Sequence, residues 1–166
     1  MLNDPAEIDR AAGATPRRGR ILVVDDEDLV RLVIARKLQG YGFEVQEARD
    51  GIDALAVIQQ ARPDLVLSDL NMPRSNGERL CIDLKRDPAT AQIPVLMMTG
   101  GPTDEARMRA AGFVGILYKP LPEDLPQYIA SVLQQHAEAA TDDVRRDHLG
   151  DDGRRSRPDR LRCGAY

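Results

Sequence analysis

The sequence predicts an α/β fold, a (βα)5 doubly wound parallel sheet, between about residues 20 and 136. Short runs of β-branched and aliphatic residues alternate with longer segments whose apolar residues recur at helical spacing, which is typical of buried parallel strands covered by helices on both faces. Four of the apolar runs end in side chains that suit phosphate or a divalent metal: Asp25-Asp26, Asp69, Thr99 and Lys119. In such sheets the working groups gather outside the carboxyl ends of the strands, so these side chains are expected to share one cleft.

The first two strand and helix pairs are predicted from residue 21 onward. Residues 21–24 form the first apolar run, and the helix after it is expected to bury four residues of one face: Val30, Val33, Ile34 and Leu38. Gly40 stands where a left-handed C-cap is expected. Residues 43–48 have the pattern of a second strand, and Asp50 is suited to cap the next helix. That helix is expected to turn three residues inward before Pro63 closes it: Ile52, Leu55 and Ile58.

The remaining three pairs follow the same alternation. The third strand is expected at residues 64–68, and the third helix, which ends before Pro88, has one apolar face: Leu80, Cys81 and Leu84. Residues 93–98 form the fourth strand, and Thr103 is predicted to cap a fourth helix that ends at Gly112. The fifth strand, at residues 114–118, precedes a last helix with five apolar positions: Leu125, Tyr128, Ile129, Val132 and Leu133.

The composition indicates one domain between two polar segments. With 166 residues the chain is long enough to build an ordinary core without disulfide or metal staples. Residues 1–19 have no sustained period and are expected to be a disordered leader, and the domain is placed at residues 20–136. Residues 137–166 are expected to be a disordered charged tail, because residues 141–166 carry seven Arg and six Asp without an apolar period.

The composition also argues against several classes of partner. The formal net charge is −4 and Trp is absent, which does not favour a basic nucleic-acid-binding face. Cys81 and Cys163 have no CxxC-type neighbour, so neither a disulfide framework nor a zinc site is expected. No segment approaches the roughly 20 apolar residues that span a bilayer. We therefore expect a cytoplasmic protein with no membrane and no nucleic-acid partner.

The acidic strand-end residues have structural alternatives when each is taken alone. Asp25, Asp26 and Glu27 suit a helix N-terminus, where acids favour the helix dipole, and Asp69 suits the start of a turn. Carboxylates gathered in one cleft would repel one another, however, and Mg2+ with oxygen ligands is the natural compensation. Opposite such a metal, Asp69 could act as a nucleophile towards phosphorus and form an aspartyl-phosphate.

The other two strand-end residues also allow two interpretations. Thr99, before Gly100 and Gly101, could be a β-branched residue at a strand end, and Lys119 could be a solvated lysine. In a shared cleft the hydroxyl and the ammonium would instead reach oxygens of a phosphoryl group.

Four motifs, together with their order along the chain, resemble those of a known family: ILVVDDE, LVLSDLNMP with Gly77 eight residues after Asp69, MMTGG and YKP. The segment from about residue 20 to 136 resembles the response-regulator receiver domain of bacterial two-component signalling. The resemblance implies a flavodoxin-like sheet with strand order 2-1-3-4-5. It also implies a cis peptide between Lys119 and Pro120.

The resemblance further implies a role for each residue of the cleft. Asp69 is the phosphoacceptor in this comparison, and Thr99 and Lys119 contact the phosphoryl group. Mg2+ is bound directly by Asp26 and Asp69, through water by Asp25, and by the backbone carbonyl of Asn71.

One position departs from the family pattern. Receivers commonly carry Tyr or Phe three residues before the lysine, and this chain has Ile116 there. Period-two alternation puts Tyr118 on the same side of the strand, roughly 6.6 Å further along. The phosphorylation chemistry is expected to be unaffected, whereas the usual aromatic readout is not expected at its usual place.

The leading hypothesis is a single-domain response regulator that accepts a phosphoryl group from a partner histidine kinase or phosphotransfer protein and then changes its binding partner. The downstream partner is expected on the face formed by the fourth helix, fifth strand and fifth helix, where Arg107 and Arg109 are candidate contacts. We expect a self-phosphorylating receiver, with at most slow autodephosphorylation, and not an enzyme. Three alternatives stay open: a phosphorelay intermediate without its own output, an aspartyl-phosphate-forming phosphohydrolase, and an interaction module that is never phosphorylated.

Overall fold

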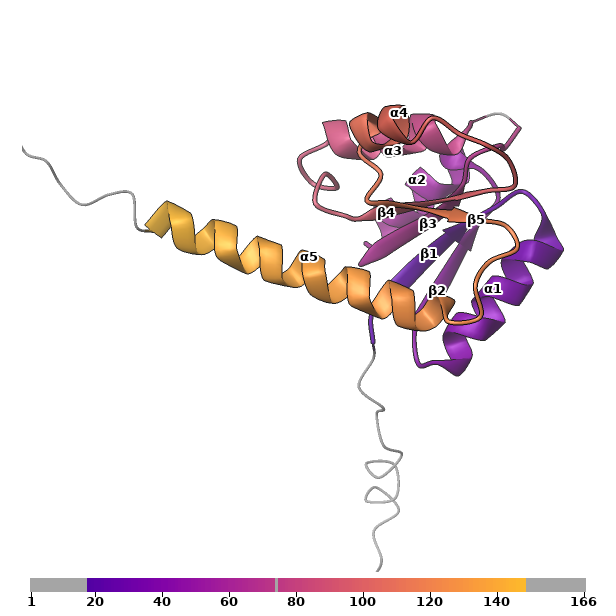
Figure 1. The fold of residues 1–166 in the computed structure, drawn as a ribbon, viewed down its shortest axis with the longest axis horizontal. Helices are drawn as coiled ribbons and strands as arrows, with labels where there is room; N and C mark the ends of the chain where they lie inside the picture. The colour runs from indigo at the N-terminus through magenta and orange to yellow at the C-terminus, as the bar shows by residue number, and fades with distance from the viewer. Residues whose placement is uncertain (1–17, 74, 149–166) are drawn as a thin grey trace, which may run out of the picture.

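The structure, a computed structural model, describes residues 18–73 and 75–148. Its five parallel strands form one sheet in the order β2-β1-β3-β4-β5, which confirms the predicted fold class and strand order (Figure 1). The strands are β1 (Arg20–Val24), β2 (Glu44–Ala48), β3 (Leu65–Asp69), β4 (Val95–Thr99) and β5 (Gly115–Tyr118). The helices are α1 (Asp28–Gly40), α2 (Gly51–Gln60), α3 (Gly77–Arg86), α4 (Glu105–Ala111) and α5 (Leu125–His148).

Helices cover both faces of the sheet. Figure 1 shows α2, α3 and α4 on one face and α1 and α5 on the other. Successive strand residues point to opposite faces, so Leu22 and Val24 of β1 pack with the first helix group while Ile21 and Val23 pack with the second. Every residue of β3 and β4 is buried, as the unbroken apolar runs predict.

The helix caps confirm two predictions and correct two others. The carboxylate of Asp50 accepts the N–H groups of Ile52 and Asp53, and Gly112 ends α4 in the left-handed conformation with φ 105°, both as predicted. Asp104 caps α4 in place of Thr103, because its carboxylate accepts the N–H of Arg107. Gly40 is the last helical residue of α1, and the chain adopts positive φ at Gly42. The turn comes later because the N–H groups of Tyr41 and Gly42 both bond to carbonyls of the last turn.

Two residues predicted to face the core are exposed. Val33 of α1 is 65% exposed and Ile52 of α2 is 64% exposed. The buried stripe of α1 instead runs through Ile34 and Leu38, which lie four residues apart, and Val33 lies at its edge. The predicted inner residues of α3 are all buried, and those of α5 all pack in the core: Leu80, Cys81 and Leu84, and Leu125, Tyr128, Ile129, Val132 and Leu133.

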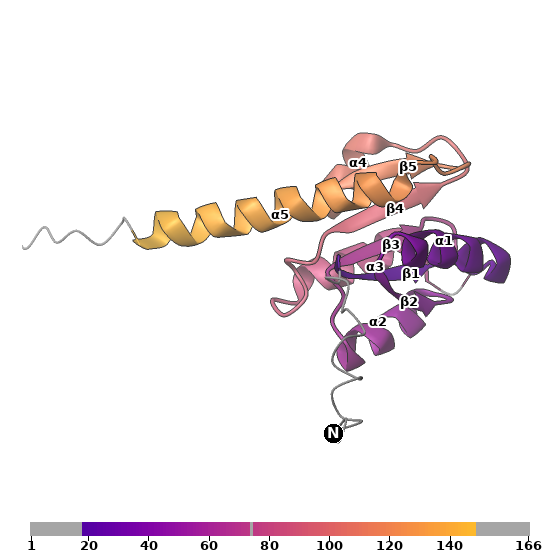
Figure 2. The same ribbon diagram turned by 90° about the horizontal axis from the view of Figure 1, so that it is seen from below.

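The last helix is longer than predicted. The sequence predicts an end near His136, but α5 continues to His148, so residues 137–148 of the predicted tail are helical. The two views of the ribbon show this part of α5 extending past the sheet (Figures 1 and 2). The segment from Ala137 to Ala140 consists of strong helix formers, and neither Gly nor Pro interrupts the helix. The rest of the predicted leader and tail, residues 1–17 and 149–166, lies outside the described residues.

Candidate phosphoacceptor site

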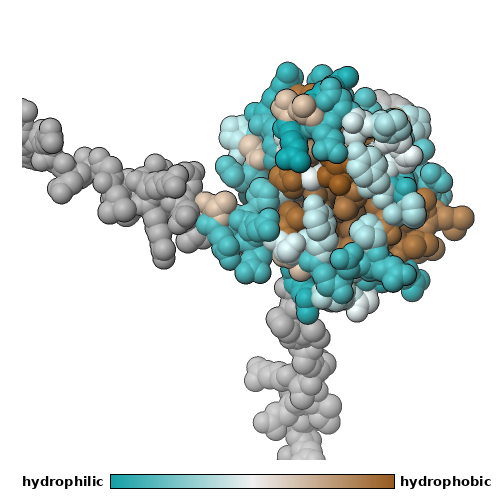
Figure 3. All heavy atoms as spheres, in the orientation of Figure 1, coloured by the Kyte–Doolittle hydropathy of each residue, from teal (hydrophilic) through white to brown (hydrophobic). Residues whose placement is uncertain are grey.

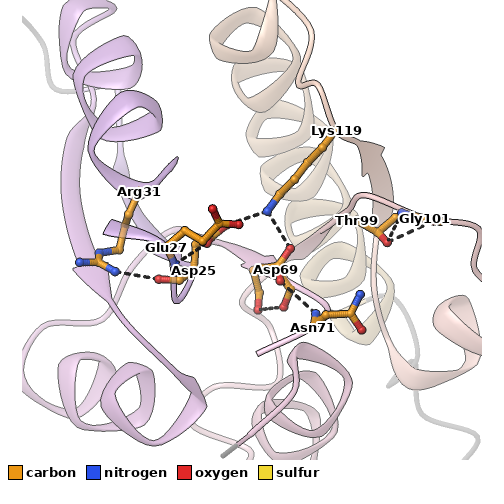
Figure 4. Close-up of polar contacts among 9 residues, drawn as sticks. Asp25, Glu27, Arg31, Asp69, Asn71, Thr99, Gly101 and Lys119 are labelled. Atoms are coloured by element: carbon orange, nitrogen blue, oxygen red, sulfur yellow. Dashed lines mark hydrogen bonds and ion pairs between the residues drawn. The ribbon is translucent and has the colours of Figure 1, made fainter. Parts of the chain in front are cut away.

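Three of the predicted site residues meet at the carboxyl end of the sheet. Asp25 follows β1, Asp69 ends β3, and Lys119 follows β5. The Nζ atom of Lys119 lies 2.9 Å from Oδ2 of Asp25 and 2.9 Å from Oδ1 of Asp69 (Figure 4). Because parallel strands end at the same edge of a sheet, groups 44 and 50 residues apart in sequence converge on one ammonium.

Asp69 is held by its own loop. Its second carboxylate oxygen, Oδ2, accepts the backbone N–H of Asn71 at 3.0 Å, and its carbonyl accepts the Ser68 hydroxyl at 3.0 Å. Gly77 begins α3 directly against this loop, where a Cβ atom would collide with the carbonyl oxygen of Asp69. The glycine eight residues after Asp69 is therefore needed for close packing of α3 against the end of β3.

Asp25 is fully buried beside Asp69. Its Oδ1 atom accepts the backbone N–H of Glu27 at 2.9 Å, while Oδ2 bonds to Lys119. Its backbone carbonyl accepts an N–H from Arg31 at 2.8 Å. Both carboxylate oxygens and the carbonyl of Asp25 therefore have donors, as a buried acid requires.

The charges of the three groups shift one another's protonation. Burial raises the pKa of Asp69, the Lys119 ammonium and the Asn71 N–H oppose that rise, and the neighbouring charge of Asp25 adds to it. Burial alone would lower the pKa of Lys119, but its bonds to Asp25 and Asp69 outweigh this effect and the pKa is raised. Two buried carboxylates share a single ammonium, which leaves a formal charge of −1 when all three groups are ionised.

Two other predicted residues lie near this cluster without joining it. Thr99 ends β4 and is buried, but its hydroxyl bonds to the carbonyl and N–H of Gly101 at 3.2 and 3.3 Å (Figure 4). Asp26, which follows the buried Asp25, is exposed. Asn71 contributes its N–H to Asp69, whereas the prediction concerns its carbonyl.

This geometry lies within a segment that matches a known family. The family model of the response regulator receiver domain matches residues 21–130. The chain belongs to that family. The predicted resemblance is confirmed, and so is the cis peptide between Lys119 and Pro120.

Known proteins of two kinds are similar to this receiver chain. The transcriptional regulator RpaA of Synechocystis is 37% identical over 115 residues, which cover 68% of this chain and 47% of that protein. The phosphate regulon regulator PhoB of Pseudomonas aeruginosa is 36% identical over 118 residues, covering 69% and 52%. The chemotaxis response regulator CheY4 of Vibrio cholerae matches in structure with a TM-score of 0.63 and 32% identity, covering 69% of this chain and 97% of that one. The chain spans about half the length of the curated relatives it matches.

The oxygen groups of the site suit Mg2+, which receiver domains generally bind at the phosphorylation site. Across residues 18–73 and 75–148, no three His, Cys, Asp or Glu side chains form a group able to hold a metal. Mg2+ does not need such a cage, because it keeps several waters and takes one or two carboxylates together with phosphate oxygens. The uncompensated negative charge of Asp25 and Asp69 therefore fits this ion.

One contact of the site has no clear signal in the sequence. Arg31 lies on the second turn of α1, and its position next to Val30 and Asp28 indicates only a surface ion pair. In the structure it reaches back to the carbonyl of Asp25. A single arginine at helical spacing does not reveal that its side chain turns towards the preceding strand.

An apolar groove of about 410 Å³ borders the site. Residues of α1 and of the segment after β5 line it: Leu29, Val30, Val33, Ile34, Lys37, Lys119, Pro120, Leu121 and Leu125. Leu29 and Val33 are 76% and 65% exposed. Figure 3 shows apolar surface over the first part of α1, so the phosphoacceptor lies beside an open hydrophobic surface.

The fourth helix carries two polar contacts to its neighbours. Arg107 bonds to both carboxylate oxygens of Glu78 on α3, at 2.9 and 2.8 Å. The Tyr118 hydroxyl lies 3.3 Å from Oε1 of Glu105. Arg109, the other predicted contact of this face, lies 4.0 Å from Glu105. These contacts cross the face that the sequence predicts to bind a downstream partner.

No helix within residues 18–73 and 75–148 combines the length and apolar character that a membrane crossing requires. Cys81 is a buried free thiol whose pKa is raised to about 11 by burial, which Lys85 partly opposes. Cys163 lies outside the described residues.

Proposed function

We propose that this chain accepts a phosphoryl group on Asp69 from the phosphohistidine of a partner kinase, in a Mg2+-dependent reaction, and thereby changes its binding partner. Receiver domains take phosphate from histidine kinases. The observation that carries the assignment to Asp69 is its carboxylate, buried at the end of β3, with one oxygen on the Lys119 ammonium. Lys119 also bonds to Asp25, so the residue that would receive the phosphoryl group already lies against a cation and a second acid.

The transfer exchanges one bond to phosphorus for another. A carboxylate oxygen of Asp69 forms the new O–P bond as the P–N bond of the phosphohistidine breaks, and the electron pair of that bond returns to the imidazole nitrogen. Lys119 is placed to move from the carboxylates to a phosphoryl oxygen, which is a stronger negative centre. The Thr99 hydroxyl would exchange its bonds with Gly101 for another phosphoryl oxygen.

The acidic residues would provide the metal site. Asp26 and Asp69 would bind Mg2+ directly, Asp25 through water, and Asn71 through its carbonyl. The chemistry that the ion supplies is neutralisation of charge on the transferred group. Asp25 also keeps Lys119 charged and close, because its carboxylate bonds to the ammonium at 2.9 Å.

The apolar groove is the surface that the phosphodonor would contact. A phosphohistidine must come within bonding distance of Asp69, so the kinase surface around it must cover the adjoining groove. Leu29 and Val33 expose apolar surface there, and Lys119 belongs both to the groove and to the site. A helix with an apolar face is the partner that fits such a groove.

The output remains broader than one domain can define. RpaA and PhoB are named as transcriptional regulators and are about twice as long as the matched segment. CheY4 is covered almost completely. A single-domain regulator, with a phosphorelay intermediate as the alternative, is our proposal for this segment, and both the cytoplasmic location and the lack of a nucleic-acid partner stay predictions.

Labelling with acetyl phosphate and Mg2+ tests the proposal. The chain should gain the mass of one phosphoryl group, and Asp69→Asn should abolish this gain. Asp64→Asn is a matched control, because Asp64 precedes the other end of β3 and accepts the N–H of Arg20 at 2.7 Å. Label that persists on Asp69→Asn would contradict the assignment.

Two further measurements separate the alternatives. Repeated turnover of a simple phosphomonoester would favour a phosphohydrolase, whereas one equivalent of label per chain favours a receiver. A folded chain that does not respond to beryllofluoride with Mg2+ would favour a module that is never phosphorylated.

A further inference from the structure

The carbonyl group of Asp25 is the first one beyond the pairing of β1. The register with both neighbouring strands ends at Val24, and the N–H of Asp25 still bonds to Ala48 at 3.2 Å. The carbonyl accepts the Nη1 donor of Arg31 at 2.8 Å (Figure 4). An arginine side chain thus replaces a ladder partner at the point where the chain leaves the sheet and enters the acidic site.

The guanidinium of Arg31 is fixed by three elements at once. Its Nε atom donates to Glu47 of β2 at 3.2 Å, and Nη2 donates to Asp28 in the first turn of α1. The side chain is only 11% exposed. Its separate donors therefore connect the end of β1, the adjacent strand and the following helix.

The charge of Arg31 is compensated away from the site. Two carboxylates, Asp28 and Glu47, pair with the single cation. The local sum of −1 does not oppose the approach of a divalent cation to Asp25 and Asp26. Arg31 can therefore hold the backbone of the acidic segment without replacing the metal electrostatically.

We propose that Arg31 is a positioning residue that orients the peptide between Asp25 and Asp26 and thereby directs the Asp26 carboxylate for Mg2+ binding. This inference rests on the proposed function. A peptide group is planar, so the direction of the Asp25 carbonyl also fixes the position of the Asp26 nitrogen and α-carbon. Because Asp26 is exposed, this backbone bond supplies order that packing does not give its side chain.

Arginine suits this task better than lysine. The guanidinium presents several N–H donors in a planar fork, and here three of its nitrogens serve three different acceptors. An ammonium on a flexible stem cannot reach the same three acceptors with fixed geometry. Arg31→Lys is therefore expected to keep the charge and to lose most of the positioning.

A Mg2+ titration of the full chain tests this role. The amide resonances of Asp26 and Glu27 would be followed by NMR in metal-free protein as Mg2+ is added. Groups that orient a metal ligand typically account for a 10- to 100-fold change in metal affinity, so the dissociation constant of Arg31→Met should rise by about 10-fold or more. Arg31→Lys should show a rise nearly as large.

Arg79→Met is the matched control. Arg79 also forms an ion pair within a helix, to Asp83 at 3.0 Å on α3, and is 63% exposed. Its Mg2+ affinity should equal that of the unaltered chain. Glu47→Gln removes one partner of the guanidinium and leaves Arg31 in place, so it should raise the dissociation constant less than Arg31→Met does, even if the latter folds poorly.

Labelling at several Mg2+ concentrations supplies a second measurement. For Arg31→Met, the Mg2+ concentration that gives half the maximal labelling rate should rise, while the maximal rate at saturating Mg2+ should return close to that of the unaltered chain. Unchanged Mg2+ affinity in folded Arg31→Lys and Glu47→Gln, even with a lower melting temperature, would overturn the inference and leave the proposed function intact. If the unaltered chain does not bind Mg2+ at all, both fall.

Discussion

The acidic site and the face formed by α4 and β5 are held together in opposite ways. At the site, Asp25 is fully buried, Asp69 is 6% exposed and Thr99 is 1% exposed. On the other face, the Arg107 side chain is 66% exposed and Tyr118 is 47% exposed. Charged groups are buried where chemistry is proposed, whereas exposed polar contacts hold the helix where a partner is predicted to bind.

This difference separates a fixed region from an adjustable one. Buried ion pairs resist rearrangement, because a charge that loses its partner cannot be solvated. Exposed contacts exchange readily with water, and each is worth little. A new phosphoryl group would therefore change the bonding at the site strongly, and the contacts of α4 to Glu78 and Tyr118 are those that can rearrange at small cost.

The largest expected effect comes from removing the shared ammonium. Lys119→Met leaves the carboxylates of Asp25 and Asp69 facing each other without a cation, and without Mg2+ it should lower the free energy of unfolding at pH 7 by about 2 kcal/mol. This is less than for a fully buried pair because the Lys119 side chain is 24% exposed. Urea denaturation would measure the change.

The sign and the control follow from the protonation of Lys119. Its pKa is raised in the folded chain above the ordinary value of 10.5, so its stabilising contribution is complete at pH 7 and is lost only as the pH rises through the folded value. Mg2+ should restore part of the stability, because a cation then returns to the site. Lys37→Met, which alters an exposed lysine bonded to the Pro122 carbonyl at 3.2 Å, should have little effect. Equal stability of both variants would show that Lys119 does not compensate the acids.

The next effect separates docking from chemistry. Val33→Asp places a charge in the apolar groove and should slow phosphotransfer from a histidine kinase about 10-fold, corresponding to about 1.4 kcal/mol. Labelling by acetyl phosphate should be unchanged, because this small donor needs no groove. The kinase would be the most active one in a panel of autophosphorylated kinases, followed by transfer of radiolabelled phosphate.

Ile52→Asp is the matched control for the groove. Ile52 is 64% exposed on α2, almost the same as Val33 at 65%, but lies outside the groove. It should leave both reactions unchanged. If Val33→Asp slows acetyl phosphate labelling as much as kinase transfer, the groove acts on the site itself and not on docking.

The raised pKa of Asp69 predicts a smaller, pH-dependent effect. Without Mg2+, Asp69→Asn should raise the melting temperature at pH 7 by a few degrees, because burial disfavours the charged form of this carboxyl. The gain should be complete above the folded pKa and vanish as the pH falls towards the ordinary value of 3.8, where the carboxyl is protonated in both states. A gain that does not depend on pH would point to a change in packing.

The sequence predicts the backbone of the site better than its side-chain bonds. Asp25, Asp69 and Lys119 could be placed together because apolar runs mark the strand ends and parallel strands end at one edge. The choice between neighbouring donors is not visible in this pattern. Thr103 and Asp104 are both good caps, and only the backbone geometry decides that Asp104 is used.

The errors of the prediction share a physical origin. The end of α5 was misplaced because residues 137–148 have helix propensity without an apolar period, so periodicity does not detect them. Arg31 was missed because a contact from a helix back to the preceding strand leaves no trace in spacing. Both features depend on polar groups, whereas the predicted core depends on apolar ones.

The smallest expected effect concerns the exposed contact between β5 and α4. Tyr118 lies on the same strand as Ile116, which occupies the usual aromatic position, and its hydroxyl lies 3.3 Å from Glu105. Burial raises the pKa of Tyr118, and the charge of Glu105 adds to the rise. Tyr118→Phe should leave the melting temperature nearly unchanged but reduce the shifts of α4 amide resonances when beryllofluoride and Mg2+ are added. Glu105→Gln should lower the pKa of Tyr118 towards its ordinary value, as ultraviolet titration would show. Full α4 shifts in Tyr118→Phe would mean that the phosphoryl signal reaches α4 through Thr99 and its loop and not through β5.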